Sequence, residues 1–138
     1  MKKAIIALVA IVGAEFIKQV GGIDTIFKSL LYLMIIDYIT GIIKSIKNKD
    51  LNSEKGYFGI LKKVLMLLIV VVAQQIDMIF AEQSIDLCVR EATIIFYIIN
   101  EIISILENAG QFVAIPEKIR EVLEQVRKKK SLGTQFSR

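Results

Sequence analysis

The chain has no histidine, no tryptophan and only one cysteine, Cys88. A single cysteine cannot form a disulfide within the chain, and without histidine there is no Cys/His set to hold a metal. An intermolecular bridge through Cys88 stays open if this residue faces an oxidising exterior. The sequence also lacks a glycine-rich phosphate loop and a nucleophile elbow. We therefore predict a protein that is not an enzyme and that holds no cofactor and no metal.

Apolar residues, in contrast, are abundant. They make up 54% of the 138 residues, and the mean hydropathy is +0.58. The net charge of +4 comes from lysines and arginines that flank the apolar runs, which fits membrane topology and anionic lipid better than nucleic acid. We predict a membrane protein that binds no nucleic acid. At about 20 residues per span, the length leaves room for three or four spanning helices and a short tail.

Four apolar stretches divide the chain, at about residues 4–20, 26–43, 60–81 and 87–107. The third has 22 residues, which as a helix reach about 33 Å and cross a bilayer. The first is diluted by Gly13, Glu15 and Lys18, so it fits a short span, an interfacial helix or part of a signal peptide. We predict an all-α membrane protein whose residues 1–110 form three to four transmembrane helices.

Residues 111–138 are predicted to form a short cytoplasmic amphipathic helix and a basic tail. Beyond Pro116, apolar residues recur at helical spacing, at Ile119, Val122, Leu123 and Val126. Four consecutive positive charges follow, at Arg127, Lys128, Lys129 and Lys130. We expect this tail to bind anionic lipid head groups, at about 1 kcal/mol per nearby Lys or Arg. Residues 131–138 show no periodicity and are predicted to be disordered.

The distribution of lysine and arginine predicts the orientation. Six lie between Lys44 and Lys63 and seven follow Gly110, but only Arg90 lies between the third and fourth stretches. By the positive-inside rule, both basic segments are cytoplasmic. We therefore predict a multi-pass protein of the bacterial cytoplasmic membrane with a cytoplasmic C-terminus. The side of the N-terminus depends on whether the first stretch spans.

Three polar residues lie deep in the predicted spans. Asp37 is near the middle of the second stretch, where an ionised side chain costs roughly 2.5–3.5 kcal/mol and is usually functional. Asn100 and Glu101 are similarly deep in the fourth. Lysines lie at the ends of the spans, so we expect no equally deep cation. Protonation, interhelical hydrogen bonds or a water-lined face should then stabilise the carboxylates.

In the alternative, the carboxylates pair with cations and only hold a bundle together. The candidate cations are Lys28, Lys44, Lys63 and Arg90.

Polar residues of the fourth stretch share one helical face. They recur in steps of four, three, four and three, at Thr93, Tyr97, Asn100, Ser104 and Glu107. In the second stretch, Gly41 and Ser45 form a small-residue step on the face of Asp37 and permit close helix approach. These faces predict self-association, because three or four short helices enclose little water within one subunit.

Several short motifs follow one another along residues 26–126. They are Asp37-Tyr38-Ile39-Thr40-Gly41, Gly59-Ile60-Leu61-Lys62-Lys63, Asp77, Asn100-Glu101, Ser104-Ile105-Leu106-Glu107-Asn108 and Ile115-Pro116. In this combination the chain resembles the toxin-secretion/phage-lysis holin family. The resemblance implies a protein that accumulates in the cytoplasmic membrane, then oligomerises into lesions that release an endolysin or a large toxin. It also marks motif positions, namely Asp37, Gly41, Asp77, Asn100, Glu101, Ser104, Glu107 and Asn108.

Two other functions remain open at this point. A small ion- or proton-coupled transporter would use the carboxylates, including Glu15, in four short helices. A membrane scaffold would use them only for packing.

Overall fold

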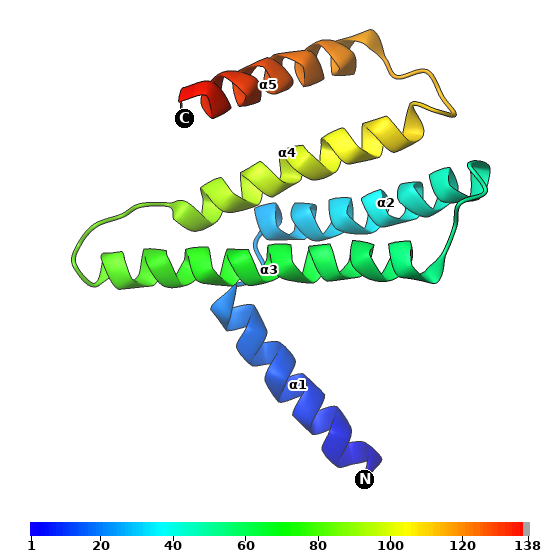
Figure 1. Cartoon of the computed structure of the whole chain (residues 1–138). Helices are drawn as coiled ribbons and strands as arrows, with labels where there is room; N and C mark the ends of the chain where they lie inside the picture. The colour runs from blue at the N-terminus through cyan, green and yellow to red at the C-terminus, as the bar shows by residue number, and fades with distance from the viewer. Residues whose placement is uncertain (137–138) are drawn as a thin grey trace.

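The computed structural model describes residues 1–136, with side chains described through residue 129. Within this part the chain is entirely helical, which confirms the predicted all-α class (Figure 1). The five helices are α1 (Lys2–Gln19), α2 (Thr25–Lys47), α3 (Ser53–Ala81), α4 (Val89–Ala109) and α5 (Glu117–Phe136).

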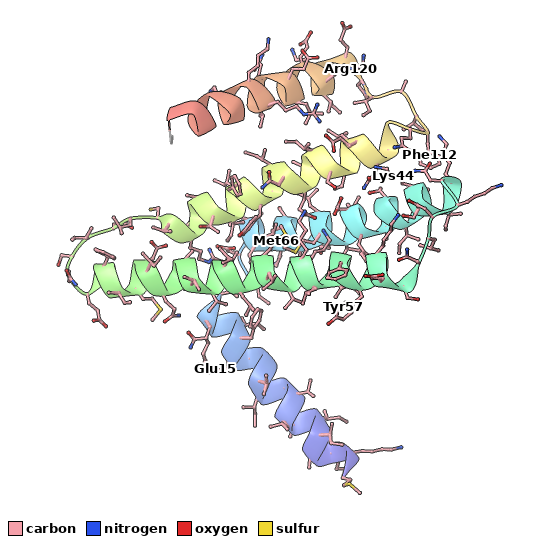
Figure 2. The ribbon with its side chains drawn as sticks, in the orientation of Figure 1. Glu15, Lys44, Tyr57, Met66, Phe112 and Arg120 are labelled. Carbon is pink, nitrogen blue, oxygen red and sulfur yellow. The ribbon has the colours of Figure 1, made fainter. Side chains whose placement is uncertain are left out.

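Helices α2, α3 and α4 form the body of the molecule. Helix α4 packs along most of α2 and also against α3, whereas α2 and α3 touch each other at few points (Figure 1). The apolar core between them is small. Its buried residues are Val20, Phe27, Leu30, Met34, Met66, Val70 and Ile94. Figure 2 shows Met66 within this body.

The ends of α2, α3 and α4 divide the body into two sides. At one end α2 and α4 finish and α3 starts, and Lys44, Tyr57 and Phe112 gather there in Figure 2. We call this the basic end, because it carries Lys44, Lys47, Lys49 and Lys55. At the opposite end α3 finishes and α2 and α4 start.

Side-chain caps explain where two of these helices begin. The carboxylate of Asp24 accepts the backbone N–H of Phe27 at 3.0 Å and starts α2. The side chain of Asn52 accepts the N–H of Lys55 at 2.7 Å and starts α3. Such caps satisfy N–H groups that have no partner in the first turn. Because of the cap at Asn52, α3 begins seven residues before the predicted start at Ile60.

Helix α1 stands apart from the body, with none of its residues buried (Figure 1). A hydrogen bond of 2.7 Å from the side-chain amide of Gln75 to Gln19 joins its last turn to α3. Glu15, labelled in Figure 2, lies in its second half and pairs with Lys18 at 3.7 Å.

Two helices, α2 and α3, are long and apolar enough to cross a membrane by length and composition. This number is lower than the three to four spans predicted from the sequence. For α1 the physical reason is length. The uncharged run 4–14 has 11 residues and covers about 16 Å as a helix, half of a bilayer's hydrocarbon core. Helix α4 keeps a polar face along its whole length.

Helix α5 follows the linker after Gly110 and lies alongside α4 in Figure 1. Its start agrees with the signal at Pro116, because the N–H groups of Ile119 and Arg120 bond to the Pro116 carbonyl. The prediction of disorder from residue 131 was wrong as far as residue 136, because α5 continues there. Residues 137–138 and the side chain of Lys130 lie outside the described part.

Candidate functional site

One lysine joins the two deep carboxylates of the body. The Nζ of Lys63, on α3, donates to Asp37 on α2 at 2.7 Å and to Glu101 on α4 at 2.5 Å. These side chains are 15%, 16% and 2% exposed, respectively. Three helices therefore meet at one buried ionic group.

The helices bring these three residues to a common level. Lys63 lies ten residues after the start of α3, Asp37 ten residues before the end of α2, and Glu101 eight before the end of α4. By helical rise, all three are about 12–15 Å from the basic end. Because all three residues lie at one level, the Lys63 side chain reaches both carboxylates.

Two further predicted residues complete what we call the central polar cluster, composed of Asp37, Thr40, Lys63, Glu101 and Asn108. The amide nitrogen of Asn108 donates to Asp37 at 3.4 Å and to the Thr40 hydroxyl at 3.3 Å. That hydroxyl donates to the backbone carbonyl of Asp37 at 3.0 Å. Hydrogen bonds of this kind between helices satisfy polar groups that water does not reach.

The expectation that Asp37 and Glu101 have no equally deep cation was wrong. The predicted span started at Ile60, which placed Lys63 in its first turn, but α3 starts at Ser53. The alternative that Lys63 pairs with the carboxylates describes the geometry correctly. The signal was present in the sequence as two adjacent lysines, Lys62 and Lys63, that an apolar run follows directly.

The shared and largely buried Lys63 makes the cluster interdependent. Removing one partner of a buried ion pair costs roughly 3–5 kcal/mol, because the remaining charge loses its counter-ion but stays out of water. Lys63 serves two carboxylates, so its loss leaves both without their counter-ion.

The other polar residues of α4 line a neighbouring space. A cavity of about 370 Å³ lies between α3 and α4. Its lining includes Lys62, Tyr97, Asn100, Glu101, Ser104 and Glu107. On the α2 side, Gly41 and Ser104 line a second cavity with Asp37 and Asn108. Four members of the predicted polar face therefore lie together beside the central polar cluster.

Asp77 and Thr93 are not part of this group. Asp77 accepts the backbone N–H groups of Val89 and Arg90, both at 2.8 Å, near the opposite end of the body. The Thr93 hydroxyl bonds to the carbonyl of Val89, within its own helix. The structure thus separates these two candidate polar positions from the central polar cluster.

The sequence offered Arg90 as a candidate cation, but not its contacts with the connection between α1 and α2. This side chain is buried and donates to the carbonyl oxygens of Val20 and Gly22. It also donates to the Asp24 carboxylate at 2.7 Å, and this bond holds the pKa of Asp24 below its ordinary value of 3.8. Arg90 thereby ties the start of α4 to the connection between α1 and α2.

Gly21 makes room for that arginine. Its φ of +83° lies in the region that favours glycine, and an added Cβ would come within 2.6 Å of the Arg90 Nε. A side chain here would meet both backbone strain and a buried guanidinium. In the sequence, Gly21 and Gly22 lie between the first and second apolar stretches, and no local pattern links them to Arg90.

The basic tail lies on α5. Arg127 is exposed and pairs with Glu107 of α4, and Lys128 and Lys129 are also exposed. The side chain of Lys130 is outside the described part. One ion pair therefore links the predicted lipid-binding tail to the polar face of α4.

Comparisons with known proteins agree with the motifs in this body. The model of the bacteriophage holin family matches residues 14–128, which include all of α2, α3 and α4 and the central polar cluster. The chain belongs to the bacteriophage holin family. This membership points to a protein that is not an enzyme.

Individual relatives agree with the family. A probable holin of Bacillus phage phi105 is 43% identical over 98 residues, 70% of each chain. An uncharacterised protein of Listeria innocua is 40% identical over 114 residues, 83% of this chain and 77% of its own length. A 14.9 kDa protein of Clostridium perfringens is 40% identical over 119 residues, 86% of this chain and 89% of its own. No solved structure matches the chain.

The family match covers the five helices to different extents. The matched region starts at Ala14, within α1, so most of that helix lies outside it. It ends at Lys128, so it includes Glu107 and Arg127. The ionic contacts of the body and the link to α5 are thus contained in the holin-like part of the chain.

Proposed function

We propose that this protein is a holin that inserts α2, α3 and α4 into the bacterial cytoplasmic membrane and oligomerises there into lesions. An endolysin or a large toxin is the released cargo. The proposal rests on the distribution of side chains, which is the reverse of that in a soluble protein: ionised groups are buried and large apolar side chains are exposed. Glu101 is buried in the body, whereas Ile36, Leu65 and Ile95 on its surface are 44%, 55% and 48% exposed.

This distribution suits lipid better than water. A soluble domain rarely leaves large contiguous apolar patches exposed, and ionisable residues within membrane helices face the bundle interior and pair there. In this body the apolar side chains of all three helices point outward and the ions meet inside. The same argument supports α4 as a third span, because Glu101 and Asn108 are buried against α2 and α3 whereas Ile95 is exposed.

The proposed orientation places the basic end in the cytoplasm. Loops rich in lysine and arginine stay on that side of the membrane. Helix α5 follows the end of α4, so it also lies on the cytoplasmic side. There its basic residues, with Arg127 among them, meet anionic lipid head groups.

The proposed lesion needs many copies of the chain. Three helices that already pack on a small core do not enclose a passage for a folded enzyme. Polar groups beside the cavity of α3 and α4, such as Tyr97, Asn100 and Glu107, are the positions we assign to contacts between copies or to the water-filled edge of the lesion. Asp37 and Glu101 set the stability of each subunit.

A release experiment tests this function. The purified chain is reconstituted in vesicles that contain a folded enzyme together with a small dye. A holin releases both, whereas an ion- or proton-coupled transporter retains the enzyme and a scaffold retains both. Retention of the enzyme at every protein density, with the chain inserted, would refute the proposal. In bacteria, lysis should require induction of the chain together with an endolysin.

A further inference from the structure

A cavity of about 270 Å³ lies between α2 and α3 at the basic end. Small residues on both helices leave this space, namely Gly41 and Ser45 on α2 and Gly56 and Gly59 on α3. The two helices touch each other at few points, and α4 packs against both of them. The cavity is therefore part of the fold and not a gap in a continuous helix contact.

Three lysines line this cavity, and two of them already have carboxylate partners. Lys63 pairs with Asp37 and Glu101, and Lys55 pairs with Asp50 at 2.5 Å. Lys62 forms no ion pair with any side chain that the structure describes. Lys62 is an exposed residue, so its side chain can take an anion as counter-ion.

The depth of Lys62 matches the lipid head groups. Helix α3 has 29 residues and is about 43 Å long, whereas the hydrocarbon core of a bilayer is about 30 Å thick. If Ala81 marks the outer boundary, roughly 20 residues fill the core and Lys62 lies at the cytoplasmic boundary. Lysines at this level extend their ammonium groups toward the lipid phosphates.

The rest of the lining is mixed, with Asp37 and Asn108 at the central polar cluster and two apolar residues that favour an amphipathic ligand. Ile42 and Leu51 line the same cavity as the lysines. A lipid can place its phosphate on Lys62 and its glycerol and upper acyl chain on these two residues. Free phosphate would gain nothing from them.

We propose that this cavity binds one anionic phospholipid of the cytoplasmic leaflet, with Lys62 as the counter-ion of its phosphate. The inference rests on the proposed membrane placement of α2 and α3. It assigns a specific lipid site to the body of the protein, apart from the basic residues of α5.

The test uses the full chain, purified in a neutral detergent and titrated with phosphatidylglycerol. Native mass spectrometry counts the bound lipid, and the thermal unfolding midpoint reports stabilisation. We expect one retained phosphatidylglycerol, with weaker binding for phosphatidylcholine and no stabilisation by inorganic phosphate. The Lys62→Gln variant should bind about fivefold more weakly, the loss expected for one lysine at the membrane surface. Lys62→Arg should restore binding.

Lys44→Gln is the matched control, because Lys44 lies at the same end but does not line the cavity. It should bind phosphatidylglycerol as the natural chain does. Equal affinity of the natural chain and Lys62→Gln, equal loss in Lys44→Gln, or stabilisation by inorganic phosphate alone would overturn the lipid site. Circular dichroism checks that each variant is folded.

The vesicle release assay separates this inference from the proposed function. A chain that releases the enzyme but retains no phosphatidylglycerol keeps the function and loses the lipid site. A chain that retains the lipid through Lys62 but releases nothing keeps the site and loses the function.

Discussion

The carboxylate of Asp77, near the end of α3, accepts the backbone N–H of Arg90 at 2.8 Å, and its other oxygen accepts that of Val89. The residue at the cap position of α4, Cys88, has a φ of 52° and makes no capping bond of its own. One helix therefore caps the next. This cap also fixes the turn from which the Arg90 side chain reaches Asp24 and the connection between α1 and α2.

Removal of this cap should destabilise the protein. We expect Asp77→Ala to lower the free energy of unfolding by about 1–2 kcal/mol, the usual value of a helix cap. Asp77→Asn keeps one acceptor oxygen and should lose less. Thermal unfolding in detergent, followed by circular dichroism, measures both variants.

Asp86 provides the control for Asp77, because it is an exposed carboxylate in the same connection and does not cap α4. Asp86→Ala should unfold close to the natural chain. Equal unfolding midpoints for Asp77→Ala and Asp86→Ala would show that the cap contributes nothing measurable.

Loss of Lys63 should be more severe than loss of either carboxylate. Lys63→Met leaves Asp37 and Glu101 buried without their counter-ion, at a cost of roughly 3–5 kcal/mol. Adding Asp37→Asn and Glu101→Gln to the same chain removes those charges and should recover most of the loss. Unfolding midpoints of the single and triple variants in detergent test this interdependence.

The unfolding midpoints of these variants show whether the ion pairs of Lys63 with Asp37 and Glu101 stabilise the fold. A triple variant as unstable as Lys63→Met would contradict the ionic account. In cells, Asp37→Asn and Glu101→Gln should each change the time of lysis at matched protein levels. Unchanged lysis times in both variants would show that the cluster stabilises the fold without affecting lesion formation.

The helices of this protein follow closely from the sequence, because long apolar runs bounded by polar loops have one favourable structure in lipid. The exact start of α3 does not, since the two turns that follow the cap at Asn52, residues 53–59, contain two glycines and begin with three polar residues. That shift of seven residues changed the interpretation of Lys63 from a residue in the first turn of its helix to the counter-ion of Asp37 and Glu101.

Contacts between residues that are far apart in the sequence could not be predicted either. The periodicity of α4 predicted that Tyr97, Asn100, Ser104 and Glu107 share a face, and these residues do line one cavity. No local pattern links Arg90 to Asp24, because 66 residues separate them and the pair forms only when α4 packs along α2. Pairings of this kind depend on the tertiary arrangement.

Acidic pH should weaken the connection between α1 and α2. Arg90 lowers the pKa of Asp24 in the folded chain, so the unfolded chain binds more protons as the pH falls. The stabilisation of the folded chain by the Arg90–Asp24 pair is complete above the ordinary carboxyl pKa of 3.8. It is lost as the pH falls through the lowered pKa of Asp24 in the folded chain. The midpoint difference between the natural chain and Asp24→Asn should therefore shrink at acidic pH. A constant difference would contradict the pairing.

The ion pair between Arg127 and Glu107 should affect timing and not the ability to form lesions. Both side chains are more than half exposed, and such surface pairs contribute less than about 1 kcal/mol. Deleting residues 127–138 removes this pair and the basic tail but leaves α2, α3 and α4 intact. We expect the truncated chain to release the enzyme from vesicles and to lyse cells at a changed time. Loss of release at a normal membrane level would assign the tail to the lesion itself.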